Sequence, residues 1–274
     1  MAIDLDQAKA ALASDGFCVV PNVVAGEELD RARSALANTV ETMRSRQIST
    51  YSETLDPNDA NIRVYHLPAW DPIFIELLRH PAAKALVEAS IGPGAIVSNF
   101  TANIALPGSG SMNVHSDQAL IVPPPWLEPW AMNVIWCLDD VHEANGATRY
   151  VPGSQYYTRF EDVPDNLIER SVAFSAPAGS VIAMDGRVWH TSGENVTKDE
   201  RRAMMFAYYT RDFIRPQVNW AVVLSAETQA GLDDEGRQMF GLGPMGNIRI
   251  GGGLTRLREG KGPAVAPPHE AAVG

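Results

Sequence analysis

The feature that most constrains this chain is a change in sequence pattern near residue 95. Before it, apolar residues recur at helical spacing, and after it short β-type runs alternate with Gly, Pro and Asn. The runs cover 95–106, 112–116, 131–138, 147–151, 180–184, 188–191 and 202–210. Several short strands at this spacing are typical of a sandwich or barrel. Because helices precede them, we expect an α+β fold in which helices flank a mainly β core.

The N-terminal part predicts the flanking helices. They are expected over about residues 5–15, 27–46, 72–79 and 82–90, with a short strand at 17–20. The polar residues 47–61 predict a loop. We expect a single domain over residues 1–250, followed by a flexible tail, rich in Gly, Pro and Ala, over residues 251–274.

Composition excludes several classes of protein. The net charge of -11 argues against a nucleic-acid-binding surface. No stretch approaches the roughly 18 apolar residues of a membrane span, and the acidic N-terminus has no secretory signal pattern. Cys18 and Cys137 lie in apolar runs and predict buried, reduced thiols rather than a disulfide. We therefore expect a cytoplasmic protein without a nucleic-acid or membrane partner. Composition leaves the oligomeric state open, and a homodimer is one option.

Three residues form a candidate metal site. On a strand, His115 and Asp117 would point to the same face, as two of the three ligands of a 2-His-1-carboxylate iron site. His190 follows about 70 residues later, beside a second expected strand, and can supply the third ligand. Taken alone, the first pair is better explained as a surface histidine near an aspartate. His190 alone is equally consistent with a core histidine held by one hydrogen bond.

Arg201, eleven residues after His190, begins the last apolar strand together with Arg202. An arginine that enters a buried strand needs an anionic partner, and a guanidinium fits a carboxylate. The partner is either the distal carboxylate of 2-oxoglutarate or a nearby acidic side chain such as Glu200, Asp199 or Asp185. Neighbouring strand residues face opposite ways, so only one of the two arginines should face the site.

Taken together, these blocks resemble the phytanoyl-CoA dioxygenase (PhyH) family of Fe(II)/2-oxoglutarate oxygenases. The matching segments are Asp15 to Pro21, His115-x-Asp117-Gln118, Asn145 to Ser154, Pro177-x-Gly179-Ser180, His190-x-Ser192-Gly193-x-Asn195 and Arg201. The resemblance spans about residues 5–212. It implies a double-stranded β-helix, that is, a jelly-roll or cupin-like fold.

The resemblance also implies site residues and cofactors. His115, Asp117 and His190 would bind Fe(II), and Arg201 would bind 2-oxoglutarate. Further cosubstrate contacts would come from Ser192, Thr148, Trp136 and Gln118. With O2, such an enzyme oxidises its substrate by hydroxylation, desaturation, epoxidation or rearrangement.

The expected substrate is a small, largely apolar molecule, for instance of secondary metabolism. This expectation rests on the Pro- and Trp-rich segment 122–130 and on the absence of a basic region for a CoA phosphate. Candidate substrate contacts are Tyr65, His66, Trp126 and Trp130. Two other functions compete with this interpretation: a cupin-like metalloenzyme without 2-oxoglutarate, which does not need Arg201, and a non-catalytic barrel that only binds a ligand.

Overall fold

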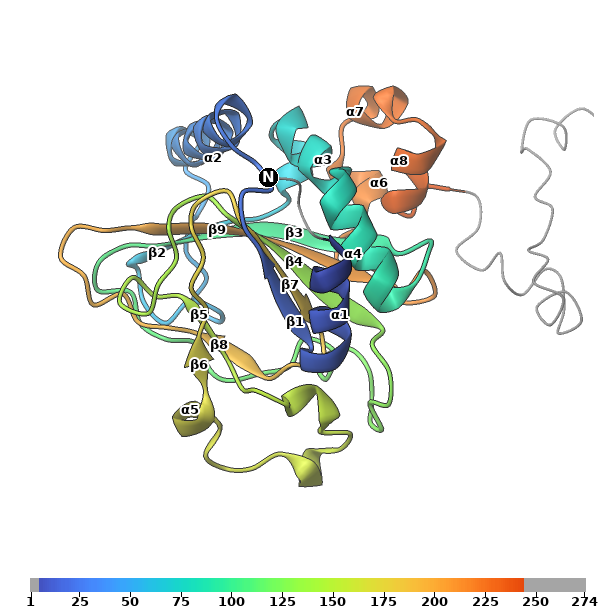
Figure 1. Ribbon diagram of the computed structural model, residues 1–274. Coiled ribbons are helices and arrows are strands. Elements are labelled where there is room, and N and C mark those ends of the chain that lie inside the picture. The colour runs from blue at the N-terminus through green and yellow to red at the C-terminus, as the bar shows by residue number, and fades with distance from the viewer. Residues whose placement is uncertain (1–4, 244–274) are drawn as a thin grey trace, which may run out of the picture.

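The computed structural model describes residues 5–243, and its strands form two antiparallel sheets (Figure 1). The larger sheet has the order β1-β7-β4-β9-β3-β2, and the smaller sheet has the order β6-β5-β8. The strands of the larger sheet are β1 Phe17–Val20, β2 Asn61–Val64, β3 Ile96–Ala105, β4 Ala131–Cys137, β7 Val181–Asp185 and β9 Arg202–Thr210. Those of the smaller sheet are β5 Thr148–Tyr150, β6 Val172–Ala173 and β8 His190–Ser192.

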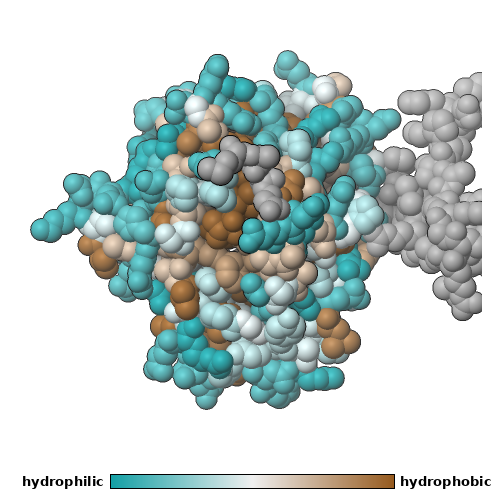
Figure 2. Space-filling view, viewed as in Figure 1, coloured by the Kyte–Doolittle hydropathy of each residue, from teal (hydrophilic) through white to brown (hydrophobic). Residues whose placement is uncertain are grey.

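Helices cover one face of the larger sheet (Figure 1). The four long N-terminal helices are α1 Leu5–Asp15, α2 Glu27–Ser45, α3 Pro72–Leu78 and α4 Pro81–Ile91. Shorter ones follow at α5 Leu167–Arg170, α6 Trp220–Val223, α7 Ala226–Gly231 and α8 Asp234–Met239. The outward faces are hydrophilic over much of the view in Figure 2, in keeping with the high net charge.

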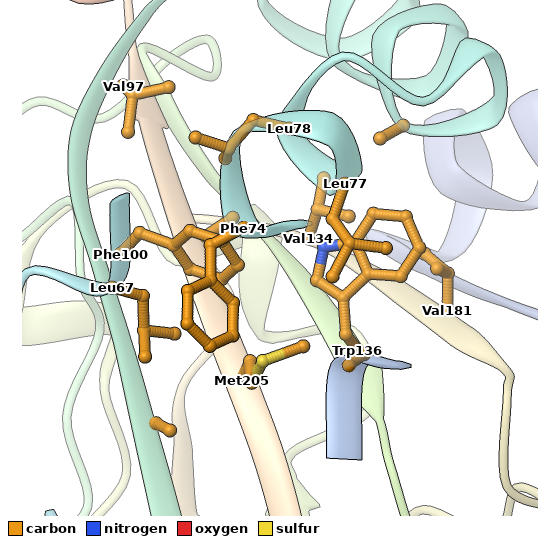
Figure 3. Packing of buried hydrophobic residues seen from close by; sticks show 14 of the residues in the cluster. Leu67, Phe74, Leu77, Leu78, Val97, Phe100, Val134, Trp136, Val181 and Met205 are labelled. Carbon is orange, nitrogen blue, oxygen red and sulfur yellow. The ribbon is translucent and has the colours of Figure 1, made fainter. Parts of the chain in front are cut away.

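Side-chain alternation along β4 divides the core into two layers. Val134 and Trp136 pack against the helices, and Figure 3 shows Trp136 close to Leu77 and Val181. Ile135 points the other way, into an apolar cluster shared with residues of the smaller sheet. The larger sheet is therefore buried on both faces, by helices on one side and by the smaller sheet on the other.

The expected α+β, jelly-roll architecture is confirmed, although two segments differ from the prediction. Residues 112–116 form no regular strand and contribute only one isolated bridge, at His115. Residues 61–64, at the end of the expected loop, form the edge strand β2 beside β3. Short polar segments of this kind become strands through pairing with a neighbour, which single-sequence periodicity does not register.

Some expectations stay predictions. The division into a domain over residues 1–250 and a tail is not tested, and residues 251–274 lie outside the described part of the chain. Within the described part, no helix is both long and apolar enough to cross a membrane.

Both cysteines are free and buried, which gives a first testable prediction. Burial raises the pKa of the Cys18 thiol to about 11 and that of Cys137 to about 12. On the order of one thiol in a thousand, or fewer, is then ionised at pH 8. We expect the two thiols of the native protein not to react with an aromatic disulfide reagent at pH 8. The unfolded chain should release two equivalents of the reagent's aromatic thiolate, one for each cysteine. Rapid reaction of the native protein would contradict the burial of these thiols.

Candidate active site

His115, Asp117 and His190 converge on one point. One ligand atom from each residue lies within 4.8 Å of the other two. The Asp117 Oδ1 atom is 3.7 Å from His115 Nε2, and Asp117 Oδ2 is 3.8 Å from His190 Nε2. Two imidazoles and one carboxylate at this spacing form the three-ligand set that holds non-haem iron and leaves coordination positions open.

Backbone hydrogen bonds hold the two histidines in place. The His115 N–H donates to the His190 carbonyl at 2.9 Å, and the His190 N–H donates to the His115 carbonyl at 2.8 Å. Each ring Nδ1 lies near a carbonyl of its own segment, that of Asn113 at 2.9 Å and that of Val188 at 3.0 Å. If Nδ1 carries the proton, both Nε2 atoms are free to bind a metal. Burial lowers the pKa of His190 and so favours the neutral, ligating form.

Asp117 reaches the same point from a turn, not from the strand that the sequence predicts. The turn is tied down by the Ser116 hydroxyl and the Gln118 N–H, which both donate to the Gly186 carbonyl. Its carboxylate Oδ2 accepts a hydrogen bond from Asn133 Nδ2, and its backbone carbonyl accepts one from the Tyr208 hydroxyl at 3.2 Å. The expected convergence is therefore present, although the local backbone that creates it differs.

The triad lines a cavity of about 160 Å³ that also contains a buried arginine, Arg202. Arg202 Nε donates to the Gly146 carbonyl at 3.0 Å, and Nη1 donates to Asn103 Oδ1 at 3.1 Å. Among residues 5–243, no carboxylate lies within ion-pair distance of Arg202, and Nη2 has no hydrogen-bond partner. Burial lowers its pKa to about 10, so the side chain remains cationic at neutral pH. An unpaired buried cation of this kind is costly unless an anion joins it.

Arg201, which the resemblance names for 2-oxoglutarate, lies outside the cavity lining. Its side chain is 52% exposed, and its Nε atom is 3.3 Å from Asp139 Oδ2. The same carboxylate oxygen accepts the backbone N–H of Ala203 at 3.0 Å. Because side chains alternate along β9, this arrangement turns Arg201 outward and Arg202 into the cavity. One arginine of the pair faces the site, as expected, but it is the second one.

Thr148 and Ser192, which the resemblance names as cosubstrate contacts, line the same cavity as Arg202. They are register partners on β5 and β8, and both line the cavity. Arg202 reaches the smaller sheet at Gly146, two residues before Thr148. Gly193 permits this close packing, since a Cβ atom there would lie 2.7 Å from the Ala147 carbonyl oxygen. The cavity thus combines the three metal ligands with a buried cation, and residues of both sheets line it.

Arg63 is a second guanidinium on the cavity wall, but it is already neutralised. Its Nη2 atom lies 2.6 Å from Asp56 Oδ1, and the Asp56 side chain is fully buried. Asp56 Oδ2 also accepts the backbone N–H of Ser52 at 2.9 Å. The loop that carries Asp56 is therefore tied to the cavity wall by a buried ion pair.

Removing the partner of Arg63 tests this pair. Asp56→Ala leaves a buried guanidinium uncompensated, and we expect the free energy of unfolding to fall by about 3–5 kcal/mol. A chemical denaturation curve measures the change. Glu76→Ala serves as the control, because Glu76 pairs with Arg31 at the surface with both side chains 51% exposed. Loss of that pair should cost no more than about 1 kcal/mol, and equal effects of the two changes would contradict the assignment.

Two expected cosubstrate contacts, Trp136 and Gln118, lie outside the cavity lining. Trp136 is fully buried on the helix-covered face of β4, on the opposite side of the sheet from the cavity. Gln118 is a structural residue whose side-chain amide bridges the backbone of Glu128 and Trp130 at 3.0 and 2.8 Å. Alternation on β4 places Asn133 and Ile135, not Trp136, on the side of the site.

The four expected substrate contacts also lie outside the cavity lining. Trp126 is buried, with its ring N–H donating to the Val122 carbonyl at 2.7 Å and its ring against Phe160. Trp130 packs edge-on against Phe213. Tyr65 and His66 contact each other, and His66 also packs against Trp220. These four residues therefore pack against neighbouring side chains of the protein and do not form walls of the cavity.

Several cavity residues escaped the sequence analysis. They are Arg63, Asn103, Asn133, Phe206 and Tyr208, in addition to Arg202. A signal for one of them was present, because Asn133 is a polar residue that interrupts the otherwise apolar strand β4. A polar side chain in such a strand is either hydrogen-bonded or part of a site.

Comparisons with known proteins agree with this geometry. The family model of phytanoyl-CoA dioxygenase (PhyH) matches residues 12–203. The chain is 42% identical over 259 residues to "Dioxygenase af480" of Aspergillus fumigatus, an alignment that covers 94% of this chain and 84% of that protein.

Solved structures with low sequence identity share the fold. The non-heme alpha ketoglutarate dependent epimerase SnoN from nogalamycin biosynthesis superposes with a TM-score of 0.61 at 21% identity, covering 84% of this chain and 91% of that one. A second SnoN structure contains Fe3+, alpha ketoglutarate and nogalamycin RO. The carbocyclase SnoK gives a TM-score of 0.61 at 21% identity, covering 78% and 88% of the two chains. With its His-Asp-His site, its fold and its sequence match, this chain belongs to the PhyH family of Fe(II)/2-oxoglutarate-dependent dioxygenases.

Proposed function

We propose that the protein oxidises a C–H bond of a small natural product that carries polar groups. Fe(II) binds at His115, Asp117 and His190, and Arg202 binds 2-oxoglutarate. The observation that carries the proposal is the unpaired, buried guanidinium of Arg202 in the cavity that the three ligands line. Neither competing function, a metalloenzyme without a dicarboxylate cosubstrate or a barrel that only binds a ligand, requires a buried cation beside the metal ligands.

The charges of the cavity support a divalent cation together with a dianion. Arg63 and Arg202 each bring one positive charge. Asp56 and Asp117 each bring one negative charge, so these four side chains cancel when the histidines are neutral. Binding Fe(II) alone would leave two positive charges in a partly buried site, and the two carboxylates of 2-oxoglutarate would restore neutrality. Buried charge is stable only when it is compensated in this way.

The chain's own residues then have distinct tasks. Arg202 binds the distal carboxylate with its free Nη2, while Thr148 and Ser192 offer hydroxyl groups beside it. His115, Asp117 and His190 hold the iron, which together with the cosubstrate and O2 supplies the oxidant for the C–H bond. Burial raises the pKa of Tyr208, which therefore stays protonated and keeps its hydrogen bond to the Asp117 carbonyl.

The lining of the cavity favours a substrate with polar groups. Beyond the metal ligands, the wall carries Thr101 and Gln217 next to Phe206, whereas the tryptophans that suggested an apolar pocket pack elsewhere. A mixed wall of this kind positions a small molecule by a few hydrogen bonds. SnoN and SnoK, which share the fold, come from nogalamycin biosynthesis, and this supports a natural product as the substrate. Hydroxylation and ring rearrangement are both compatible with this wall.

Anaerobic absorption spectroscopy tests the proposal. We expect Fe(II) and 2-oxoglutarate together, but neither alone, to produce the charge-transfer band of a chelated 2-oxo acid. Pyruvate has the same 2-oxo acid head but no distal carboxylate, and it should require a far higher concentration because it cannot reach Arg202. Iron-loaded, folded protein without the band would overturn the proposal, and equal affinity for the two acids would overturn the role of Arg202.

A further inference from the structure

Asn133 is the one polar residue of β4, whose sequence is otherwise Ala, Met, Val, Ile, Trp and Cys. It is 6% exposed and lies on the cavity side of the larger sheet. Its register partners on the neighbouring strands are Tyr208 and Met184. A position of this kind ordinarily holds an apolar side chain, as Ile135 does two residues along the same face.

The hydrogen bonds of Asn133 fix the direction of its amide. Nδ2 donates to Asp117 Oδ2, and a carboxylate that binds a metal can only accept. Oδ1 therefore points away from Asp117, and it is buried without a hydrogen-bond partner among residues 5–243. A buried acceptor without a donor destabilises the folded state, so packing alone does not account for an asparagine here.

The two carboxylate oxygens of Asp117 are otherwise nearly equivalent. Oδ1 is 3.7 Å from His115 Nε2, and Oδ2 is 3.8 Å from His190 Nε2. Nothing in the triad itself decides whether one oxygen or both would bind the metal. The hydrogen bond from Asn133 removes this symmetry, because it engages Oδ2 alone.

We propose that Asn133 is a positioning residue that makes Asp117 a one-oxygen ligand. With Oδ2 held by Asn133, Asp117 offers Oδ1 to the metal, and the place that a second carboxylate oxygen would take stays free for an external ligand. This inference rests on the metal site of the proposed function. It extends that function by naming the residue that keeps a coordination position open.

Nitric oxide, a probe for the open position of Fe(II), tests the inference. In protein loaded with Fe(II) and 2-oxoglutarate, Asn133→Leu should lower the affinity for nitric oxide by about tenfold or more, as followed by electron paramagnetic resonance. The charge-transfer band should persist in this variant. Metal-free Asn133→Leu should melt close to the temperature of the wild type, because the lost hydrogen bond to Asp117 is offset by the removal of an unsatisfied buried acceptor.

The chain offers a matched control in Asn99. It lies in the same row of the larger sheet, across Tyr208 from Asn133, but its Nδ2 donates to Gln217 Oε1 at 3.1 Å and not to a metal ligand. Asn99→Leu should leave the affinity for nitric oxide unchanged. Asn133→Val, which suits a strand interior, repeats the test if the leucine variant does not fold.

Each outcome has one meaning. An Asn133 variant with wild-type affinity for nitric oxide overturns the inference, as does an equal loss in Asn99→Leu. A wild-type protein that binds iron but forms no charge-transfer band with 2-oxoglutarate overturns the proposed function instead, and the two failures are thereby separated.

Discussion

Replacing Arg202 by leucine should raise the Kd for 2-oxoglutarate by about 30-fold or more, while the same change at Arg201 should leave it within about twofold. Loss of one partner from a buried charge pair typically costs 2–5 kcal/mol, and each 1.4 kcal/mol is a factor of ten. Arg201 is half exposed and paired with Asp139, so its removal touches no part of the cavity. The two substitutions are chemically identical and one residue apart, which makes Arg201→Leu a close control.

Titration of the anaerobic charge-transfer band with 2-oxoglutarate measures both constants. Arg202→Leu should also abolish the preference for 2-oxoglutarate over pyruvate, since only the former has a distal carboxylate. Folding of the variant is expected to survive, because leucine replaces a buried charge that has no carboxylate partner in the described residues. A larger effect at Arg201 than at Arg202 would show that the inward and outward faces of β9 have been exchanged.

Replacing His190 by alanine should lower the affinity for Fe(II) by more than about 100-fold, beyond the 10–100-fold that loss of an outer-shell partner costs. The change removes one of the three ligands and leaves the backbone pairing with His115 intact. Metal binding adds stability in proportion to the logarithm of metal concentration over Kd. The stabilisation of the wild type by Co(II), used as an oxygen-insensitive stand-in, should therefore vanish in His190→Ala.

His142→Ala is the matched control for this experiment. His142 is 41% exposed and lies 2.8 Å from Glu200 Oε2, away from the cavity lining. Its loss should leave both the Co(II) affinity and the metal-dependent rise in melting temperature unchanged. Retention of tight, stabilising metal binding by His190→Ala would remove this residue from the ligand set.

The metal site could be predicted from the sequence because its three residues converge even where the local backbone differs from the expected strand. His115 and Asp117 converge although Asp117 lies in a turn, because the turn is tied to Gly186 and returns the side chain to the same point. The α+β order was also readable, since the pattern of apolar residues changes from helical to strand-like near residue 95.

The sequence did not show which of two adjacent strand residues faces the cavity. Whether Arg201 or Arg202 faces inward depends on where β9 begins, and this is set by the contacts of Asp139 with Arg201 and with the Ala203 N–H. A shift of one residue reverses every side chain of a strand. The resemblance names Trp136 as a cosubstrate contact, whereas the register of β4 turns this side chain toward the helix layer.

The reciprocal hydrogen bonds between the His115 and His190 backbones determine how the metal site is framed. The pairing of the two histidine segments comes from the backbone and not from the imidazole rings. The frame of the site therefore belongs to the fold, and replacing either ring leaves that frame in place.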